Sequence, residues 1–167
     1  MLSVERIQSP IGPLTVVERD GRLCLLHFGR TSGLRDILGR WYPDEKTIQQ
    51  AATATRAILR RYFDGEIAAI DDVAVELNGT PFQRRVWTTL RSIPAGSTLS
   101  YSDLARRIGA ESAVRAVGAA NGANPVALVV PCHRVIGANG TLVGYGGGLP
   151  RKRWLLAHEG VTTPSLF

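Results

Sequence analysis

A cysteine followed directly by a histidine offers the clearest chemistry in this sequence. Cys132 and His133 come after Pro131 and the apolar run 126–130, which we predict to be a buried strand. A thiolate is the nucleophilic form of cysteine, and a neighbouring imidazole or guanidinium lowers the thiol pKa from about 8.5. Consecutive strand residues point to opposite faces, so His133 would reach the sulfur only through a bend or a water. An inert buried cysteine beside an unrelated histidine is the alternative.

The segment after this pair is rich in glycine. A turn is predicted over 137–140, and Tyr145 stands among four glycines at 144–148. Such a backbone allows a planar ligand to approach closely and leaves N–H donors free. The segment lacks the GxxxxGK[ST] pattern of a phosphate loop. A plain linker is the alternative, but the position beside a candidate nucleophile favours the wall of a binding site.

Glu159 follows the last predicted helix, 150–158. A carboxylate at a helix C-terminus is disfavoured by the helix dipole by a few tenths to about 1 kcal/mol. Two interpretations follow, either a cationic partner such as His133 or an accident of the surface. The residues by themselves favour the second.

The other cysteine lies in a different setting. Cys24 belongs to the apolar run 22–28 and is predicted to be a buried strand residue. Neither Cys24 with His27 nor His133 with His158 has the spacing of a structural zinc site, so we predict no metal. Two cysteines in such contexts are typical of a reduced, cytosolic protein.

The 167-residue chain has a formal charge of +6 that is unevenly spread. Residues 1–78 hold ten Lys and Arg against eleven acidic residues, whereas residues 79–167 hold ten against three. Eighteen of the 20 cations are arginines, which favours bidentate contacts with phosphate. Nucleic acid is therefore the leading partner class, and a solvated basic face is the alternative. No apolar run approaches the roughly 20 residues that a membrane span needs, so no membrane partner is expected.

The basic half has well-marked helix signals. Residues 80–83 form a capping box with proline at the first helical position. Ser100 begins a second helix that stops at Gly109, and Ser112 is predicted to cap a third helix, 113–121. Two helices joined by a short glycine-containing turn are typical of a helix-turn-helix, although plain packing motifs share this pattern.

The third of these helices carries very small side chains. Alanine and glycine predominate between Ala116 and Ala120, and only Arg115 is long. Small residues let a backbone approach a neighbour closely, which suits either a packed helix or a DNA groove with Arg115 projecting into it. The charge of this half makes DNA at least as well supported as packing.

The first half contains no chemical motif. Alternating apolar residues predict a three-stranded antiparallel meander over 2–28. Helical spacing predicts a helix over 44–63, and 70–78 is predicted to be a linker. The expected domains are 1–78 and 79–167.

The site residues resemble those of a known family. The run 131–135, preceded by 121–125 and followed by 144–148, is similar to the active-site region of the O6-alkylguanine-DNA alkyltransferases. The resemblance extends over nearly the whole chain. It implies an α+β fold, with a small N-terminal RNase H-like α/β domain built on an antiparallel sheet and a mostly helical C-terminal domain containing a helix-turn-helix.

The resemblance implies direct-reversal DNA repair. An alkyl group from O6-alkylguanine, with O4-methylthymine as a second candidate substrate, would pass irreversibly to Cys132 in one turnover after base flipping. His133, oriented by Glu159 and acting through a water, would generate the thiolate. Tyr101 would give the guanine a proton or a hydrogen bond, and Asn124 would hold the turn before the active-site strand.

The resemblance also assigns contacts. The guanine edge would meet backbone groups of the active-site segment, and an arginine would fill the space of the extruded base in the minor groove. The implied substrate-binding residues are Val135, Tyr145 and Gly146. The implied DNA-binding residues are Arg115, Ala116, Tyr101 and Ala120.

The implied partner is double-stranded DNA containing O6-alkylguanine, bound by a cytoplasmic monomer without metal or cofactor. Some family members bind a structural zinc in the first domain, and the ligand set is missing here. Gly146 stands where certain relatives carry serine. The main alternative is a sensor that binds alkylated DNA without transfer. A Cys-His hydrolase is a third hypothesis, which lacks a convincing oxyanion hole and leaves the basic half unexplained.

Overall fold

The computed structural model describes residues 1–29 and 33–162. The chain divides into two compact units, Met1–Gly79 and Thr80–Phe167. The first unit is built on a small sheet and the second is mostly helical, which confirms the predicted α+β class. Within the described residues, no helix has the length and apolar character needed to cross a membrane.

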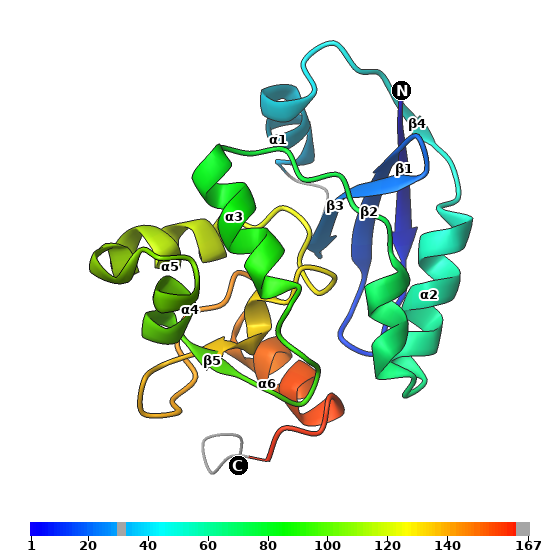
Figure 1. Ribbon diagram of the computed structural model, residues 1–167. Helices are drawn as coiled ribbons and strands as arrows, with labels where there is room; N and C mark the ends of the chain where they lie inside the picture. The colour runs from blue at the N-terminus through cyan, green and yellow to red at the C-terminus, as the bar shows by residue number, and fades with distance from the viewer. Residues whose placement is uncertain (30–32, 163–167) are drawn as a thin grey trace. The chain divides into compact units, whose positions relative to one another are not determined.

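The sheet of the first unit has the strand order β3-β2-β1-β4 (Figure 1). Strands β1 (Leu2–Ile7), β2 (Leu14–Arg19) and β3 (Arg22–Phe28) form the predicted antiparallel meander. Asp20 and Gly21 both have positive φ, 50° and 76°, as the tight turn between β2 and β3 requires. The sheet has a fourth strand that was not predicted, β4 (Thr47–Gln49), which pairs with β1 in parallel.

The helices of this unit cover its sheet. Helix α1 (Leu34–Trp41) packs on the core face that includes Leu2 and Cys24. The helix predicted over 44–63 begins late, because residues 47–49 form β4 and α2 spans only Thr53–Phe63. A carboxylate from the sheet fixes this start, since the N–H of Ala52 donates to Glu5 Oε2 at 2.6 Å.

The predicted linker 70–78 is instead part of the first unit. It begins inside the 3-10 helix η1 (Ile67–Asp72), and Ile70 and Val73 are buried. The chain then runs beside the edge strand β3, where Leu23 and Val75 form a parallel bridge. Apolar residues at alternate positions extend the sheet here, which explains why the segment is not a free connection.

The second unit opens with the predicted capping box. In helix α3 (Pro81–Leu90), Thr80 Oγ1 accepts from the Gln83 N–H at 3.1 Å, and Gln83 Oε1 accepts from the Thr80 N–H at 3.0 Å. The Trp87 ring is fully buried and its Nε1 donates to the carbonyl of Ala120 at 2.7 Å. This bond ties α3 to the helix that contains Ala120.

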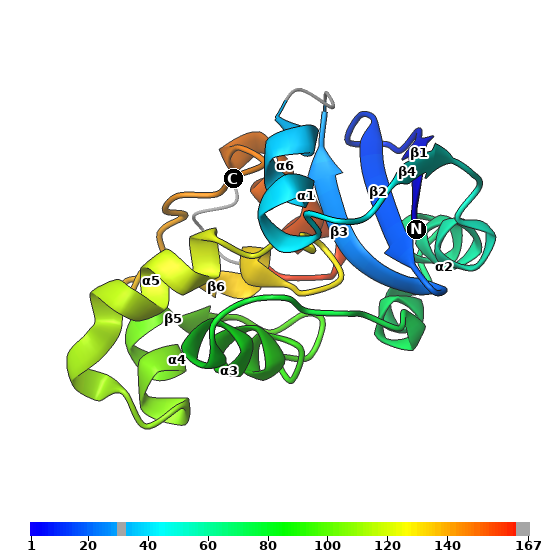
Figure 2. The ribbon, with the colours of Figure 1, turned by 90° about the horizontal axis from the view of Figure 1, so that it is seen from above.

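The helix-turn-helix is formed by α4 (Tyr101–Arg107) and α5 (Val114–Gly122), which lie beside α3 (Figure 2). Ser100 caps α4 by accepting from the Asp103 N–H at 3.0 Å. The predicted cap of α5 by Ser112 is wrong. Residues 111–113 form a 3-10 turn (η2), so α5 starts after Ala113 without a side-chain cap.

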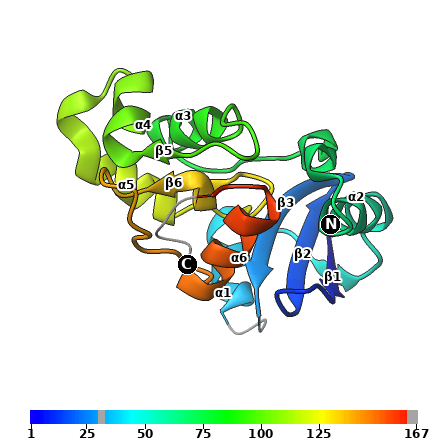
Figure 3. The ribbon, with the colours of Figure 1, turned by 90° about the horizontal axis from the view of Figure 1, so that it is seen from below.

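Four of the five residues of the apolar run 126–130 are buried, but the run is not a strand. It forms successive turns, in which the N–H of Val130 donates to the carbonyl of Val126 at 2.9 Å and Leu128 has a φ of 71°. A 3-10 turn, η3 (Cys132–Arg134), follows. The short strands β5 (Leu99–Ser100) and β6 (Val135–Ile136) then pair in parallel, and helix α6 (Leu149–His158) closes the unit (Figure 3).

Candidate active site

The predicted nucleophile lies on a 3-10 turn rather than at the end of a strand. Cys132 is the first residue of η3, is a free thiol, and is 7% exposed. Because the backbone turns here, the strand geometry that would send neighbouring side chains to opposite faces does not apply. His133 is completely buried in the same turn. The thiol and the imidazole therefore both lie inside the second unit.

The structure confirms that Glu159 has a cationic partner and is not an exposed carboxylate placed at the helix end by chance. His133 Nε2 lies 2.8 Å from Glu159 Oε1. Arg134 donates through Nε to Oε2 at 2.9 Å and through a second guanidinium nitrogen to Oε1 at 3.0 Å. All three side chains are buried. Such a pair of parallel charge-assisted bonds holds a carboxylate in one orientation.

A loop packs against this network from the other side. Arg134 also donates to the carbonyl of Ile93 at 2.6 Å. Gly96 has a φ of 83°, and a Cβ there would come within 3.2 Å of the Glu159 carbonyl oxygen. The glycine is required both for the backbone conformation and for the close approach.

The charges of this network follow from its contacts. Burial alone would raise the pKa of Glu159, but the hydrogen bonds from His133 and Arg134 and the positive charge of the guanidinium hold that pKa well below its usual range. Burial lowers the pKa of His133 and outweighs the attraction of Glu159. The arginine is always protonated, so it balances the carboxylate while the imidazole stays neutral.

This arrangement leaves one nitrogen of His133 free to act as a base. A neutral imidazole whose Nε2–H donates to an ionised Glu159 carries its lone pair on Nδ1. That Nδ1 is buried and has no hydrogen-bond partner among the described residues. The carboxylate also stabilises the imidazolium that forms when Nδ1 takes a proton.

Cys132 needs such a base. Burial raises the pKa of its thiol, while a hydrogen bond from Asn124 and the charge of Lys152 lower it. The net direction is upward, so the resting group is a thiol and not a thiolate. Its deprotonation therefore depends on the buried polar groups that surround it.

Asn124 holds the turn that carries the thiol. Its Nδ2 donates to the carbonyl of Val130 at 2.7 Å, and its Oδ1 accepts from the N–H of Val126 at 2.9 Å. These two bonds close the loop that the apolar run forms. They give the physical reason why the run is turned and not extended.

Lys152 is a site residue that the sequence analysis missed. It is completely buried in α6, and its Nζ donates to the carbonyls of Val135 at 2.6 Å, Val143 at 2.9 Å and Gly144 at 3.4 Å. Burial lowers its pKa to about 8. It ties the glycine-rich segment to β6 while holding charge near Cys132. The available signal was its spacing from Leu155 and Leu156 on one helix face.

Of the predicted substrate-binding residues, Val135 contacts this lysine, and Tyr145 and Gly146 come directly after Gly144, which the lysine also holds. Val135 is fully buried, and its carbonyl accepts from Lys152. The Tyr145 ring stands edge-on to the His133 ring, with centroids 6.5 Å apart. Gly146 is exposed, and a Cβ built there would meet no atom of the described residues within 4 Å. A small side chain at this position is therefore sterically permitted.

Tyr101 lies near the thiol and contacts α5. Its half-buried ring lies against Gly118, where a Cβ would be 3.7 Å from the ring. Burial raises the pKa of its hydroxyl, and the negative charge of a Cys132 thiolate raises it further. Tyr101 therefore remains a protonated donor at neutral pH.

The exposed face of α5 differs in one residue from the prediction. Arg115 and Ala116 are exposed, but Ala120 is 3% exposed, and its backbone carbonyl accepts the bond from the Trp87 ring. The side chain of Ala120 is therefore buried in the fold, and the DNA contact predicted for this residue stays a prediction. The small residues that do reach the surface along this face are Ala116, Ala119, Gly122 and Ala123.

The described residues contain no group of three His, Cys, Asp or Glu that could hold a metal ion.

One unit is built on a small sheet, and the other contains a helix-turn-helix and a buried cysteine followed by a histidine. These features fit the class of DNA-binding proteins that carry a reactive thiol. The ribonuclease-like domain of 6-O-methylguanine DNA methyltransferase matches residues 4–77, and the DNA-binding domain of the same family matches residues 81–161. The chain belongs to this family.

Named relatives agree over nearly the full length. The methylated-DNA--protein-cysteine methyltransferase of Salmonella typhimurium is 47% identical over 161 residues, covering 93% of this chain and 94% of the relative. That of Mycobacterium tuberculosis is 46% identical over 165 residues, covering 99% of this chain and 96% of the relative. The structure of M. tuberculosis OGT in complex with DNA has a TM-score of 0.78 at 44% identity, covering 94% and 92%.

Proposed function

We propose that this protein repairs DNA by moving the alkyl group of O6-alkylguanine onto Cys132, once per molecule. The observation that carries the proposal is the buried set of Cys132, neutral His133 with an open Nδ1, and ionised Glu159. The names of relatives above 40% identity, each a methylated-DNA--protein-cysteine methyltransferase, support the same reaction.

The transfer balances without a cofactor. His133 Nδ1 takes the thiol proton, directly or through a water, and Glu159 stabilises the imidazolium. The thiolate sulfur attacks the alkyl carbon, so a C–S bond forms while the C–O bond to guanine breaks. The electron pair passes to the guanine, and Tyr101 supplies a proton or hydrogen bond to the leaving base. The product is unmodified guanine and a thioether on Cys132.

The thioether explains a single turnover. Cleaving an S-alkyl bond requires a strong nucleophile aimed at the alkyl carbon, and the groups around Cys132 are a neutral base, an amide and a buried ammonium. Alkylation also adds volume to a packed interior, which destabilises the fold. The modified protein is therefore expected to be inactive and less stable.

The buried thiol requires the base to leave the duplex. Extrusion costs a few kcal/mol of stacking and pairing. In the proposed complex, Arg115 enters the vacated space, while the small residues of α5 let its backbone approach the minor groove. The extruded guanine lies against Tyr145, with its edge meeting backbone groups of Val135 and Gly146. O4-methylthymine is a second candidate substrate of the same pocket.

The division of labour follows the two units. The segment 79–167 acts as the DNA-binding and catalytic domain, and 1–78 acts as an accompanying α/β domain. Action on chromosomal DNA places the protein in the bacterial cytoplasm, and the proposed active form is a monomer.

Incubation with a duplex containing O6-methylguanine tests the proposal. Peptide mapping by mass spectrometry should find one methyl group on the Cys132 peptide and none on the Cys24 peptide. A duplex with unmodified guanine and the Cys132→Ala variant are the controls. Absence of methyl from the Cys132 peptide would refute the transfer. A non-catalytic sensor predicts instead that Cys132→Ala protects alkylated cells as well as the wild type does.

A further inference from the structure

Among the described residues, an open hollow in the second unit is lined by three arginines and no carboxylate. It has a volume of about 520 Å³ and lies between the outer face of α3 and the C-terminal end of α4. We call it the arginine hollow. Its lining residues are Pro81, Arg84, Arg85, Thr88, Thr89, Arg107 and Ile108.

The three guanidinium groups differ in what they already contact. Arg85 donates to the carbonyl of Ile108, which anchors it at the end of α4. Arg84 and Arg107 are exposed and have no acidic partner among the described residues. The neighbouring Arg106 is already paired with Asp103 at 2.7 Å. Two cations of the hollow are therefore available to an external anion.

We propose that the arginine hollow binds backbone phosphate of the DNA beside the lesion, as a second anchor besides Arg115. This inference rests on the proposed function. Arginine presents a planar set of donors that matches phosphate, and threonine hydroxyls are common donors to the same oxygens. Three like charges around one hollow repel one another, and a phosphodiester relieves this repulsion.

The position of the hollow within the helix-turn-helix fits this role. It is formed at the C-terminal end of α4, from which the chain passes through residues 109–113 directly into α5. Arg115 stands on the first turn of α5. A duplex lying along the exposed face of α5 therefore passes close to the end of α4, where its backbone can reach Arg107.

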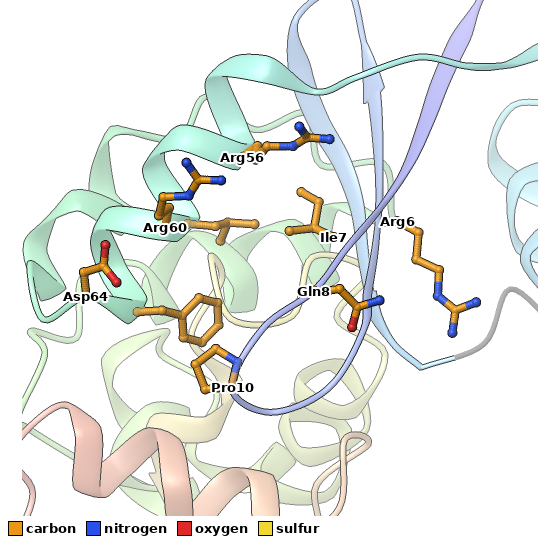
Figure 4. A pocket seen from close by; sticks show the side chains of 9 residues that line it. Arg6, Ile7, Gln8, Pro10, Arg56, Arg60 and Asp64 are labelled. Carbon is orange, nitrogen blue, oxygen red and sulfur yellow. The ribbon is translucent and has the colours of Figure 1, made fainter.

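A hollow in the first unit provides a contrast. It is lined by Arg6, Arg56 and Arg60, but Asp64 also lines it and Arg56 is paired with Glu5. Figure 4 shows Arg6 pointing away from the other labelled side chains. The arginines of this hollow are largely paired with carboxylates or point in different directions, so we do not expect it to bind an anion as the arginine hollow does.

The test is DNA affinity as a function of salt. The double variant Arg84→Gln/Arg107→Gln is compared with Arg60→Gln/Arg153→Gln, which removes two exposed arginines from α2 and α6. With an unmodified duplex, losing two phosphate contacts should reduce the slope of log K against log salt by about 1.8. Affinity near 0.1 M salt should fall roughly tenfold or more, and the control should keep the wild-type slope.

Reaction with free O6-benzylguanine checks that the active site is intact. The double variant should react within about twofold of the wild type, because no duplex backbone is involved. Arg107→Gln alone, at an exposed position, should reduce the slope by about 0.9, which keeps the proposal testable if the double variant folds poorly.

The outcomes separate the two proposals. If the arginine-hollow variants keep the same slope of log K against log salt as the control, and the protein transfers methyl groups normally, the role of the arginine hollow is refuted and the proposed function is not. A wild type that binds DNA with a steep salt dependence but never methylates Cys132 would refute the proposed function and leave the phosphate anchor standing.

Discussion

The two cysteines of this protein are both buried, but the groups around them differ, so that one thiol is expected to be inert and the other to be a nucleophile. Cys24, in the sheet of the first unit, is 4% exposed, and Cys132, in the second unit, is 7% exposed. Burial raises the pKa of both thiols. Their accessibility therefore does not distinguish them.

The groups around each sulfur do distinguish them. Cys24 donates to the carbonyl of Val17 at 3.3 Å, and burial together with the nearby carboxylate of Glu76 raises its pKa to about 11. Cys132 instead lies near an amide donor and a buried ammonium, and the residue after it is a histidine with an open nitrogen. A buried cysteine becomes a nucleophile when its surroundings can stabilise the thiolate and accept the proton, whereas burial alone makes it inert.

The largest effect should come from exchanging each cysteine for alanine. Cys132→Ala should abolish methyl acceptance from an O6-methylguanine duplex, because no other thiol is activated. Cys24→Ala should leave the transfer rate within about twofold, since it removes only a small buried apolar group. Radiolabel transfer to protein measures both. Methyl transfer retained by Cys132→Ala, or lost by a folded Cys24→Ala variant, would refute the assignment of Cys132 as the nucleophile and Cys24 as inert.

The next largest effect is expected for Glu159→Gln. The amide no longer stabilises the imidazolium of His133, so the transfer rate should fall about 100-fold or more. Arg134 is left as an unbalanced buried charge, which should cost about 3 kcal/mol of unfolding free energy. Labelling of Cys24 after denaturation serves as an internal reference for protein amount.

The same variant has a pH signature. Because the folded pKa of Glu159 is depressed, its stabilising contribution is present above the unfolded pKa of about 4.3 and is lost as pH falls below that value. The free energy of unfolding of the wild type should therefore decline below about pH 5 more steeply than that of Glu159→Gln. Parallel declines in denaturant titrations would show that Glu159 is not ionised in the fold.

A smaller effect is expected for Lys152→Met. The variant keeps the length of the side chain but removes the charge near Cys132 and leaves three carbonyls without a donor, so transfer should slow about tenfold. The loss should be equal for a duplex and for free O6-benzylguanine, because the lysine acts on the thiol and pocket.

Stability against pH gives a readout of the lysine itself. The folded pKa of Lys152 is about 8, so between about pH 8 and 10.5 the unfolded chain binds the proton more strongly. The unfolding free energy of the wild type, relative to Lys152→Met, should therefore rise with pH through this window. A flat difference would show that the lysine titrates normally in the fold.

The smallest effect is expected for Arg115→Ala. Repair of a methylated duplex should slow about fivefold, because the extruded base loses its replacement in the stack. Reaction with free O6-benzylguanine should be unchanged, since Arg115 is exposed on α5 and is absent from the buried network. Equal losses on both substrates would assign Arg115 a structural role.

Local patterns predicted much of the fold correctly. The capping box at Thr80 and Gln83, the Ser100 cap and the meander over 2–28 depend on residues a few positions apart, and all of them are present. The failures are at places where distant groups decide. The start of α2 is set by Glu5 on β1, and the run 126–130 is folded by Asn124.

The sequence by itself determined the order of the elements, the charge imbalance and the motif around Cys132, because each of these features depends only on residue types and on residues a few positions apart. Only the tertiary structure decided that Glu159 lies against His133, that Lys152 points into the site and that Ala120 faces inward. These are contacts between residues many positions apart, and their energies depend on burial. Periodicity cannot show how deeply a polar side chain is enclosed or which charge it meets there.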